Sequence, residues 1–126
     1  MDVPWPAEEE LAERLAVIHL AADRFIGVNS YEHLLLDLLR LLQSDRVPRT
    51  TATEFMFKLV EEWGAGAVEI LEFTMRTLQW PEVREALLAH AHKGEDFRTR
   101  GLARHALEVY EAQWPNGEIY RTYRET

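Results

Sequence analysis

Two pairs of glutamates are the residues of this chain whose type and spacing best suit metal chemistry. Glu10 and Glu13 form one pair, and Glu69 and Glu72 form the other. Residues three apart are neighbours on a helix surface, so each pair would present two carboxylates on one face. Pairs on two different helices could hold Mg²⁺ for phosphate chemistry. A Mg²⁺-dependent helical hydrolase acting on a phosphate ester or nucleotide is therefore one alternative function, although a solvated helix face is the simpler interpretation of both pairs.

The histidines and hydroxyl side chains indicate no further chemistry. His90 and His92 are two positions apart, so on a helix they point to different sides and cannot easily share a metal ion, even with His105 nearby. The chain has no cysteine, and Ser30 and Ser44 suit a helix cap and a helix end. The sequence contains neither a nucleophile motif nor a glycine loop suited to phosphate. We therefore predict a protein that is not an enzyme, with no catalytic residue, metal ligand or cofactor.

Acidic residues are concentrated in the first part of the chain. Residues 1–72 contain 14 acidic and 6 basic residues, whereas residues 73–126 contain 8 of each, which gives the net charge of −8. This excess of negative charge disfavours nucleic acid and favours a basic protein partner, although a solvated acidic surface is the simpler interpretation. If a partner binds, we expect the surface to include the acidic residues Asp37, Glu54, Glu61 and Glu62.

Basic residues gather in the last third of the chain. Acidic residues interleave with them, so we expect many of these charges to pair with one another inside the fold. Binding of phosphate or nucleic acid by this basic face is the second alternative function. The basic group comprises Arg84, His90, His92, Lys93, Arg98, Arg100 and Arg104, and the interleaved acids are Glu82, Glu85, Glu95 and Asp96. From this group we add Arg98, Arg100 and Arg104 to the expected partner-binding residues.

A recurring dipeptide marks the elements that must position these residues. Trp-Pro occurs as Trp5-Pro6, Trp80-Pro81 and Trp114-Pro115, and Pro48 falls between the first two. These four prolines are 42, 33 and 34 residues apart, and each interval is long enough for two helices and a turn. We therefore predict a single domain over residues 1–126, with helical hairpins at about 6–47, 48–80 and 81–115 and a tail at 116–126.

Apolar residues that recur at three and four positions predict six helices. The predicted ranges are about 6–24, 31–43, 54–63, 67–79, 81–92 and 97–113, with a polar linker over 44–53. Ser30 and Asp96 are expected N-caps, Pro81 is expected to open the fifth helix, and Gly64-Ala65-Gly66 to end the third. The fourth helix is expected to be the most buried, with one polar row that consists of Glu69, Glu72, Arg76 and Gln79.

The composition is that of a globular chain. Apolar residues make up 47% of the sequence and charged residues 29%, and 126 residues are enough for a hydrophobic core. The N-terminus lacks the apolar core of a secretion signal and no apolar run is long enough to span a membrane, so we expect a cytoplasmic protein without membrane contact. The predicted fold is all-α, with six helices in three stacked hairpins that form either a short solenoid or a compact bundle.

The third predicted hairpin, residues 81–115, resembles a HEAT-type helical repeat. Its first helix opens with Pro-Glu-Val-Arg-Glu-Ala-Leu at 81–87, and its second with Asp-Phe-Arg-Thr-Arg at 96–100. Small and apolar residues follow at Ala103, Ala106 and Leu107. The resemblance implies a HEAT-like stack that binds proteins or, occasionally, nucleic acid. It also implies that Asp96, Arg98 and Arg100 are structural residues that brace adjacent repeats.

Three tryptophans, Trp63, Trp80 and Trp114, fall at predicted helix ends. There an indole can cover the hairpin junction while its N–H donates to a backbone carbonyl, so we expect packing roles for them. We place Trp5, near the N-terminus, among the partner-binding residues, because Trp is enriched at binding hot spots. Together these features predict a non-enzymatic protein–protein interaction module with an acidic binding surface. One version is an inhibitor or immunity-type protein for a basic partner such as a toxin or nuclease.

Overall fold

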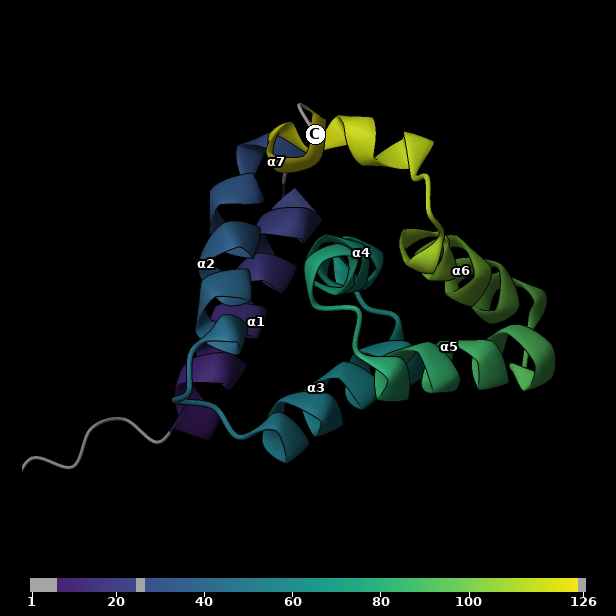
Figure 1. Cartoon of the computed structure of the whole chain (residues 1–126), viewed down its shortest axis with the longest axis horizontal. Coiled ribbons are helices and arrows are strands. Elements are labelled where there is room, and N and C mark those ends of the chain that lie inside the picture. The colour runs from purple at the N-terminus through teal and green to yellow at the C-terminus, as the bar shows by residue number, and fades with distance from the viewer. Residues whose placement is uncertain (1–6, 25–26, 125–126) are drawn as a thin grey trace, which may run out of the picture.

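The computed structural model describes residues 7–24 and 27–124, so the predicted partner-binding residue Trp5 lies outside the described residues. The described residues form an all-α fold without strands, which confirms the predicted fold class (Figure 1). The α-helices are α1 (Ala7–Arg24), α2 (Glu32–Gln43), α3 (Arg49–Glu62), α4 (Ala67–Leu78), α5 (Pro81–Lys93), α6 (Phe97–Leu107) and α7 (Arg121–Arg124). Three short 3-10 helices accompany them, η1 (Val28–Ser30), η2 (Glu108–Tyr110) and η3 (Pro115–Ile119). None of these helices combines the length and the apolar character needed to cross a membrane.

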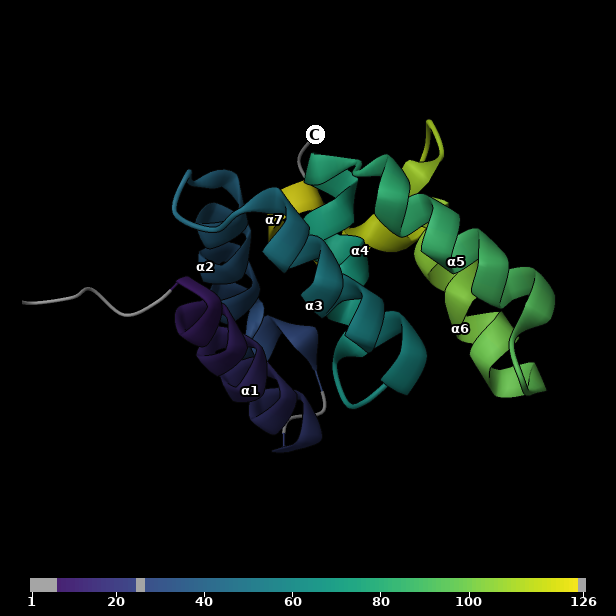
Figure 2. The same cartoon turned by 90° about the horizontal axis from the view of Figure 1, so that it is seen from below.

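The six long helices pack in two rows that follow the order of the chain. Helix α3 contacts both α1 and α5, and helix α4 contacts both α2 and α6. Each odd-numbered long helix also contacts the next even-numbered one, so α1–α2, α3–α4 and α5–α6 form three neighbouring hairpins (Figures 1 and 2). The middle hairpin therefore has a neighbour on both sides.

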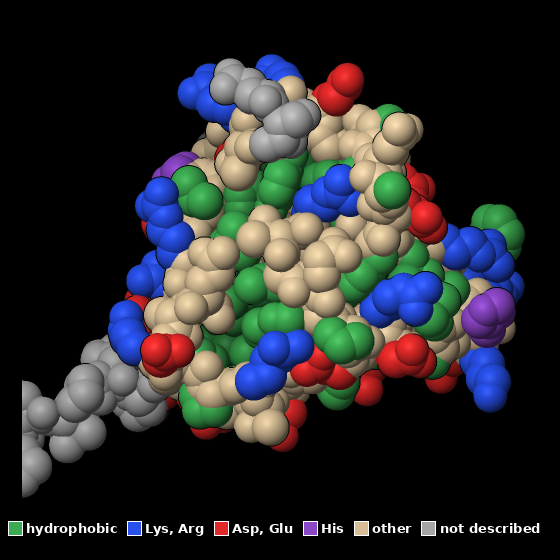
Figure 3. Space-filling model, viewed as in Figure 1, with side chains coloured by type: hydrophobic (Ala, Val, Ile, Leu, Met, Phe, Trp, Pro, Cys, Tyr) green, Lys and Arg blue, Asp and Glu red, His purple; other side chains and the backbone are tan. Residues whose placement is uncertain are grey.

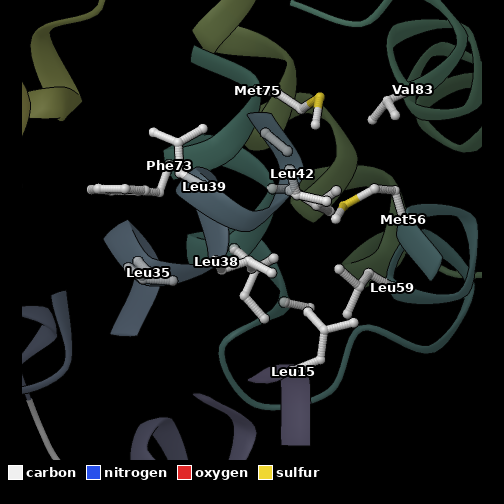
Figure 4. Packing of buried hydrophobic residues seen from close by; sticks show 14 of the residues in the cluster. Leu15, Leu35, Leu38, Leu39, Leu42, Met56, Leu59, Phe73, Met75 and Val83 are labelled. Carbon is white, nitrogen blue, oxygen red and sulfur yellow. The ribbon is translucent and has the colours of Figure 1, made fainter. Parts of the chain in front are cut away.

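Helix α4 lies at the centre of the fold and is the most buried helix, as the sequence predicts. Seven of its 12 residues are buried, and it contacts α2, α3, α6 and η2. Figure 4 shows Phe73 and Met75 of α4 in one core with side chains of the neighbouring helices. Burial of each large apolar side chain stabilises the fold by about 1.5–3 kcal/mol. A single hydrophobic cluster thus extends through all three hairpins.

The C-terminal segment, residues 108–124, closes the fold. It runs from α6 over α4 to α2 (Figure 1). On α4, the Arg76 guanidinium donates to the carbonyls of Val109 at 2.9 Å and Glu111 at 2.6 Å. On α2, the carboxylate of Glu32 accepts the backbone N–H groups of Arg121 and Thr122, both at 2.8 Å. The segment therefore ties the third hairpin to the first.

Aromatic side chains hold this segment against α4. Tyr120 is fully buried and meets Phe73 edge-on, with ring centroids 5.3 Å apart. Trp114 stacks on Tyr120 at 5.7 Å, and Tyr123 meets Phe73 edge-on at 5.2 Å. Such pairs add about 0.5–1.5 kcal/mol to the effect of area burial. The C-terminal segment is thus part of the core rather than an appendage.

Two predicted helix boundaries are wrong, and tertiary contacts explain both. Helix α3 begins at Arg49, inside the predicted polar linker. There Ala52 is buried in the core and the Thr53 hydroxyl donates to the Arg49 carbonyl at 2.7 Å. Helix α6 ends at Leu107 rather than near residue 113, because α4 side chains bind the carbonyls that follow it.

The predicted helix N-termini are confirmed in two places and wrong in one. Pro81 opens α5, and Asp96 caps α6 by accepting the Thr99 N–H at 2.6 Å. Ser30 instead belongs to η1, and Tyr31 occupies the N-cap position of α2 without a side-chain hydrogen bond.

The turn between α3 and α4 contains two residues in the left-handed conformation. Trp63 ends α3 with a φ of 48°, although the sequence predicts the following glycines for this role. A non-glycine residue costs about 1–2 kcal/mol in this conformation, and burial of the indole offsets that cost. Gly66 precedes α4 with a φ of 81°, and a Cβ there would lie only 2.9 Å from the Cβ of Ala22 on α1.

All three tryptophans at the helix ends are buried, which confirms their predicted packing role. The expected carbonyl partners are not found for Trp63 and Trp114, whose indole N–H groups have no hydrogen-bond partner among the described residues. Trp80 is covered by the guanidinium of Arg49, 4.1 Å from the ring centroid. The indoles of Trp63 and Trp114 therefore act as apolar cover.

Candidate functional site

A buried carboxyl group lies where α4, α6 and the C-terminal segment meet. Only 2% of Glu72 is exposed, although the sequence places it in a solvated polar row. Its Oε1 accepts a hydrogen bond from the Tyr120 hydroxyl at 2.5 Å. Its Oε2 has no hydrogen-bond partner among the described residues and lies 3.4 Å from Nε2 of His105. The prediction of a solvated glutamate is wrong because the C-terminal segment covers this part of α4.

The surroundings of Glu72 increase its proton affinity. Burial raises the pKa of Glu72 from 4.5 to about 7. The Tyr120 hydrogen bond and His105 lower this pKa, whereas Glu69 and Glu108 raise it further. Burial also raises the pKa of Tyr120 above its usual range, with Glu72 as the next cause. Glu72 can therefore gain or lose a proton near neutral pH.

Glu72 forms part of the wall of a cavity of about 600 Å³, which we call the Glu72 cavity. Residues from η1, α4, α6 and the C-terminal segment line it, so the fold assembles it from segments that lie far apart in the chain. Its polar lining includes Tyr31, Glu69, His105, Glu118 and Arg124, and its apolar lining includes Val28, Val68 and Ile119. Burial, followed by Glu69 and Glu72, raises the pKa of Tyr31 to about 12.

The two glutamate pairs of the hydrolase alternative do not come together. Glu10 and Glu13 line a groove between α1 and α2, whereas Glu69 and Glu72 line the Glu72 cavity. Glu10 is moreover paired with Arg14 at 3.1 Å. In the part of the chain that the structure describes, no group of three or more His, Asp or Glu residues is placed to hold a metal ion. The described residues therefore offer no two-helix carboxylate site for Mg²⁺.

The groove between α1 and α2 combines apolar and acidic side chains. We define this α1–α2 groove, about 640 Å³ in volume, by Glu10, Glu13, Arg14, Val17, Leu34 and Asp37. Val17 is 44% exposed, and the nearby Leu20 of α1 is 53% exposed. Glu13 and Asp37 are both exposed, and neither forms an ion pair with a described residue. The predicted partner-binding residue Asp37 thus lies beside exposed apolar surface.

The other acidic residues predicted to bind a partner lie on a different helix. Glu54, Glu61 and Glu62 are exposed on α3. Glu61 lines a separate pocket with His90 and Lys93 of α5. The predicted acidic set is therefore divided between α2 and α3.

Among the described residues, the basic group of the last hairpin lacks the ion pairs with acidic neighbours that the sequence predicts, although the Thr99 N–H, followed by Arg98 and Arg100, lowers the pKa of Asp96. None of its members forms an ion pair with a described carboxylate, and Glu82 pairs instead with Arg49 of α3 at 2.8 Å. Arg98 and Arg104 are exposed, whereas Arg100 is partly buried and donates to the Gly94 carbonyl at 2.9 Å. On the face shown in Figure 3, Lys, Arg and His side chains lie at the end formed by α5 and α6, and others lie along the opposite edge.

The α1–α2 groove and the Glu72 cavity both combine polar groups with room for a ligand. Comparison of the chain with protein-family models, with curated proteins and with solved structures finds no match.

Proposed function

We propose that this protein is a non-enzymatic interaction module that binds a basic partner protein through the α1–α2 groove. The observation that carries the proposal is the position of exposed Val17 and Leu20 beside the carboxylates of Glu13 and Asp37, which form no ion pair with a described residue. The partner segment that fits this surface is a basic amphipathic helix. An inhibitor or immunity-type protein for a basic toxin or nuclease would use such a surface, and the net charge of −8 supports that version.

The exposed side of α1 supports a helix as the occupant. Ala12, Ala16 and Leu20 are exposed and recur every four positions, so they form an apolar strip along the helix. Val17 lies beside the strip, in the groove itself. A second helix would cover this strip with its own apolar face. Its lysines or arginines would then meet Glu13 and Asp37.

A designed peptide tests this proposal directly. A helical peptide with leucines on one face and lysines beside them is titrated into the full chain by calorimetry at low and at high salt. We expect saturable binding that weakens as salt rises, because the carboxylates attract the lysines through screened charge. Glu13→Gln combined with Asp37→Asn should weaken binding by about tenfold, which corresponds to about 1.4 kcal/mol.

The matched control removes the same charge elsewhere. Glu54→Gln combined with Glu62→Gln also takes two negative charges from the surface, but from α3. This control should bind the peptide nearly as well as the unchanged chain. Equal weakening in both double variants, or binding that does not respond to salt, would show that the groove is not the site.

The exposed Arg98 and Arg104 of the last hairpin, which form no ion pair with a described carboxylate, favour a second candidate function, contact with phosphate. We expect a single-stranded oligonucleotide to bind at low salt if Arg98 and Arg104 serve this purpose, with affinity that falls steeply as salt rises. Filter binding of the oligonucleotide to the unchanged chain and to the Arg98→Ala, Arg104→Ala double variant measures the contribution of these two arginines. No retention of the oligonucleotide at low salt would exclude nucleic acid as the ligand of this surface.

A further inference from the structure

We propose that the Glu72 cavity binds a small organic cation, an alkylammonium ion, whose N–H groups donate to Glu72. The cavity shares no residue with the α1–α2 groove, so this inference does not depend on the proposed function.

The first reason is the unmatched oxygen of Glu72. Oε1 is occupied by the Tyr120 hydroxyl, whereas Oε2 is buried without a hydrogen-bond partner among the described residues and lies 3.4 Å from Nε2 of His105. Leaving a buried acceptor unmatched destabilises a protein, and more so when the group is charged. The N–H groups of an ammonium ion are the kind of donor that this oxygen lacks.

The second reason is the charge of the cavity wall. Glu69 and Glu118 add two further carboxyl groups to that of Glu72, against the guanidinium of Arg124 and the imidazole of His105 among the described lining residues. An anion would meet more carboxylates than guanidinium groups. A cation is therefore the ligand whose charge complements the wall.

The third reason is the size of the cavity and the polarity of its lining, which favour an organic cation over a bare metal ion. A cavity of about 600 Å³ is far larger than a bare metal ion needs, and the described residues contain no group of three His, Asp or Glu placed to hold one. Val28, Val68 and Ile119 supply apolar wall for a short alkyl chain. A primary ammonium with such a chain satisfies both the carboxyl oxygen and the apolar wall.

Proton linkage gives the site a pH signature. The titratable or charged groups around Glu72 are Tyr31 near η1, Glu69 on α4, His105 on α6, Glu108 on η2, and Glu118, Tyr120 and Arg124 in the C-terminal segment. Because the cation prefers ionised Glu72, its affinity should rise as pH increases through the pKa of about 7.

The test uses n-butylammonium chloride and the neutral analogue n-pentanol, each titrated into the ¹⁵N-labelled full chain and followed by NMR. We expect saturable shifts for the ammonium ion alone, with a dissociation constant on the order of millimolar. The shifts should map to amides around Glu72, and the affinity should be severalfold higher at about pH 8 than at about pH 6.

Two variants test whether Glu72 is the residue that binds the ammonium ion. Glu72→Gln keeps an oxygen acceptor for the Tyr120 hydroxyl but removes the charge, and it should lower affinity by at least about tenfold. Glu108→Gln removes a carboxylate near Glu72 that does not line the cavity, and it should bind as before. If Glu72→Gln does not fold, Glu69→Gln takes its place, with severalfold weaker binding expected. Equal binding of n-pentanol, no saturable shift, or unchanged affinity in the variant that removes a cavity carboxylate would each overturn the proposal.

Discussion

The carboxyl group of Glu72 is buried and titrates near neutral pH, so it makes folding depend on pH. Its pKa is raised from 4.5 to about 7, which means that the native state holds this proton more tightly than the unfolded chain. The contribution of Glu72 is therefore fully present below about pH 4.5 and is lost as pH rises to about 7. We predict that the loss is on the order of 3 kcal/mol in the free energy of unfolding.

Urea unfolding of the full chain and of Glu72→Gln at about pH 5 and about pH 8 measures this contribution. The chain contains other ionisable groups, so the relevant quantity is the difference between the two proteins at each pH. The glutamine variant should gain stability relative to the unchanged chain as pH rises. Glu108→Gln, which removes an acid nearby but half-exposed, should leave most of the pH dependence in place. A difference between the chain and Glu72→Gln that stays constant with pH would contradict the assignment.

The sequence identifies Glu72 as a residue of interest but not its surroundings. Its spacing from Glu69 predicts correctly that both carboxyl groups lie on one face of α4. Tyr120, which donates a hydrogen bond to the buried carboxyl group of Glu72, lies 48 residues later, and no local pattern connects the two. Helical periodicity reports which residues share a face, but not which distant segment will cover that face.

In the turn between α3 and α4, both the start of α4 and the close approach of the turn to α1 depend on one glycine, Gly66. Gly66 has a φ of 81°, which side chains rarely adopt, and a Cβ there would lie 2.9 Å from the Cβ of Ala22. We predict that Gly66→Ala destabilises the protein by about 2 kcal/mol or more, from backbone strain and from displacement of α1. Thermal or urea unfolding at constant pH measures the change.

Gly101 provides the matched control for this substitution. It lies within α6, and a Cβ there would meet nothing within 4 Å. Gly101→Ala should therefore stabilise the protein by about 0.4–1 kcal/mol, because alanine favours the helix and restricts the unfolded chain. If both substitutions destabilise to the same extent, the close packing of Gly66 on α1 is not the reason.

Prediction of the helices from sequence succeeded where the signal is local. Pro81 and Asp96 mark the starts of α5 and α6 through their own backbone chemistry. Prediction failed where contacts with distant residues determine the end of a helix. Arg76 and Gln79 of α4 bind the carbonyl of Val109, which follows the last turn of α6. The early end of α6 therefore depends on residues about 30 positions earlier in the chain.

At the scale of the whole molecule, the C-terminal segment distinguishes this fold from a simple row of hairpins. In such a row each unit contacts only its neighbours, and units can unfold one after another. Here the segment that follows α6 crosses the central helix and places backbone N–H groups on Glu32 of α2. The first and third hairpins are thereby linked directly, as well as through the middle one.

We therefore predict that the chain unfolds in one cooperative transition. Tryptophan fluorescence, which senses the buried Trp63, Trp80 and Trp114, and circular dichroism, which senses helix content, should give the same urea midpoint. Tyr120→Ala should lower the free energy of unfolding by about 3–5 kcal/mol, because this fully buried ring packs on the central helix. It should shift both signals together, since the lost contact belongs to the core that all three hairpins share. Two separate midpoints, or a Tyr120→Ala effect confined to fluorescence, would mean that the hairpins unfold independently and that the C-terminal segment only covers them.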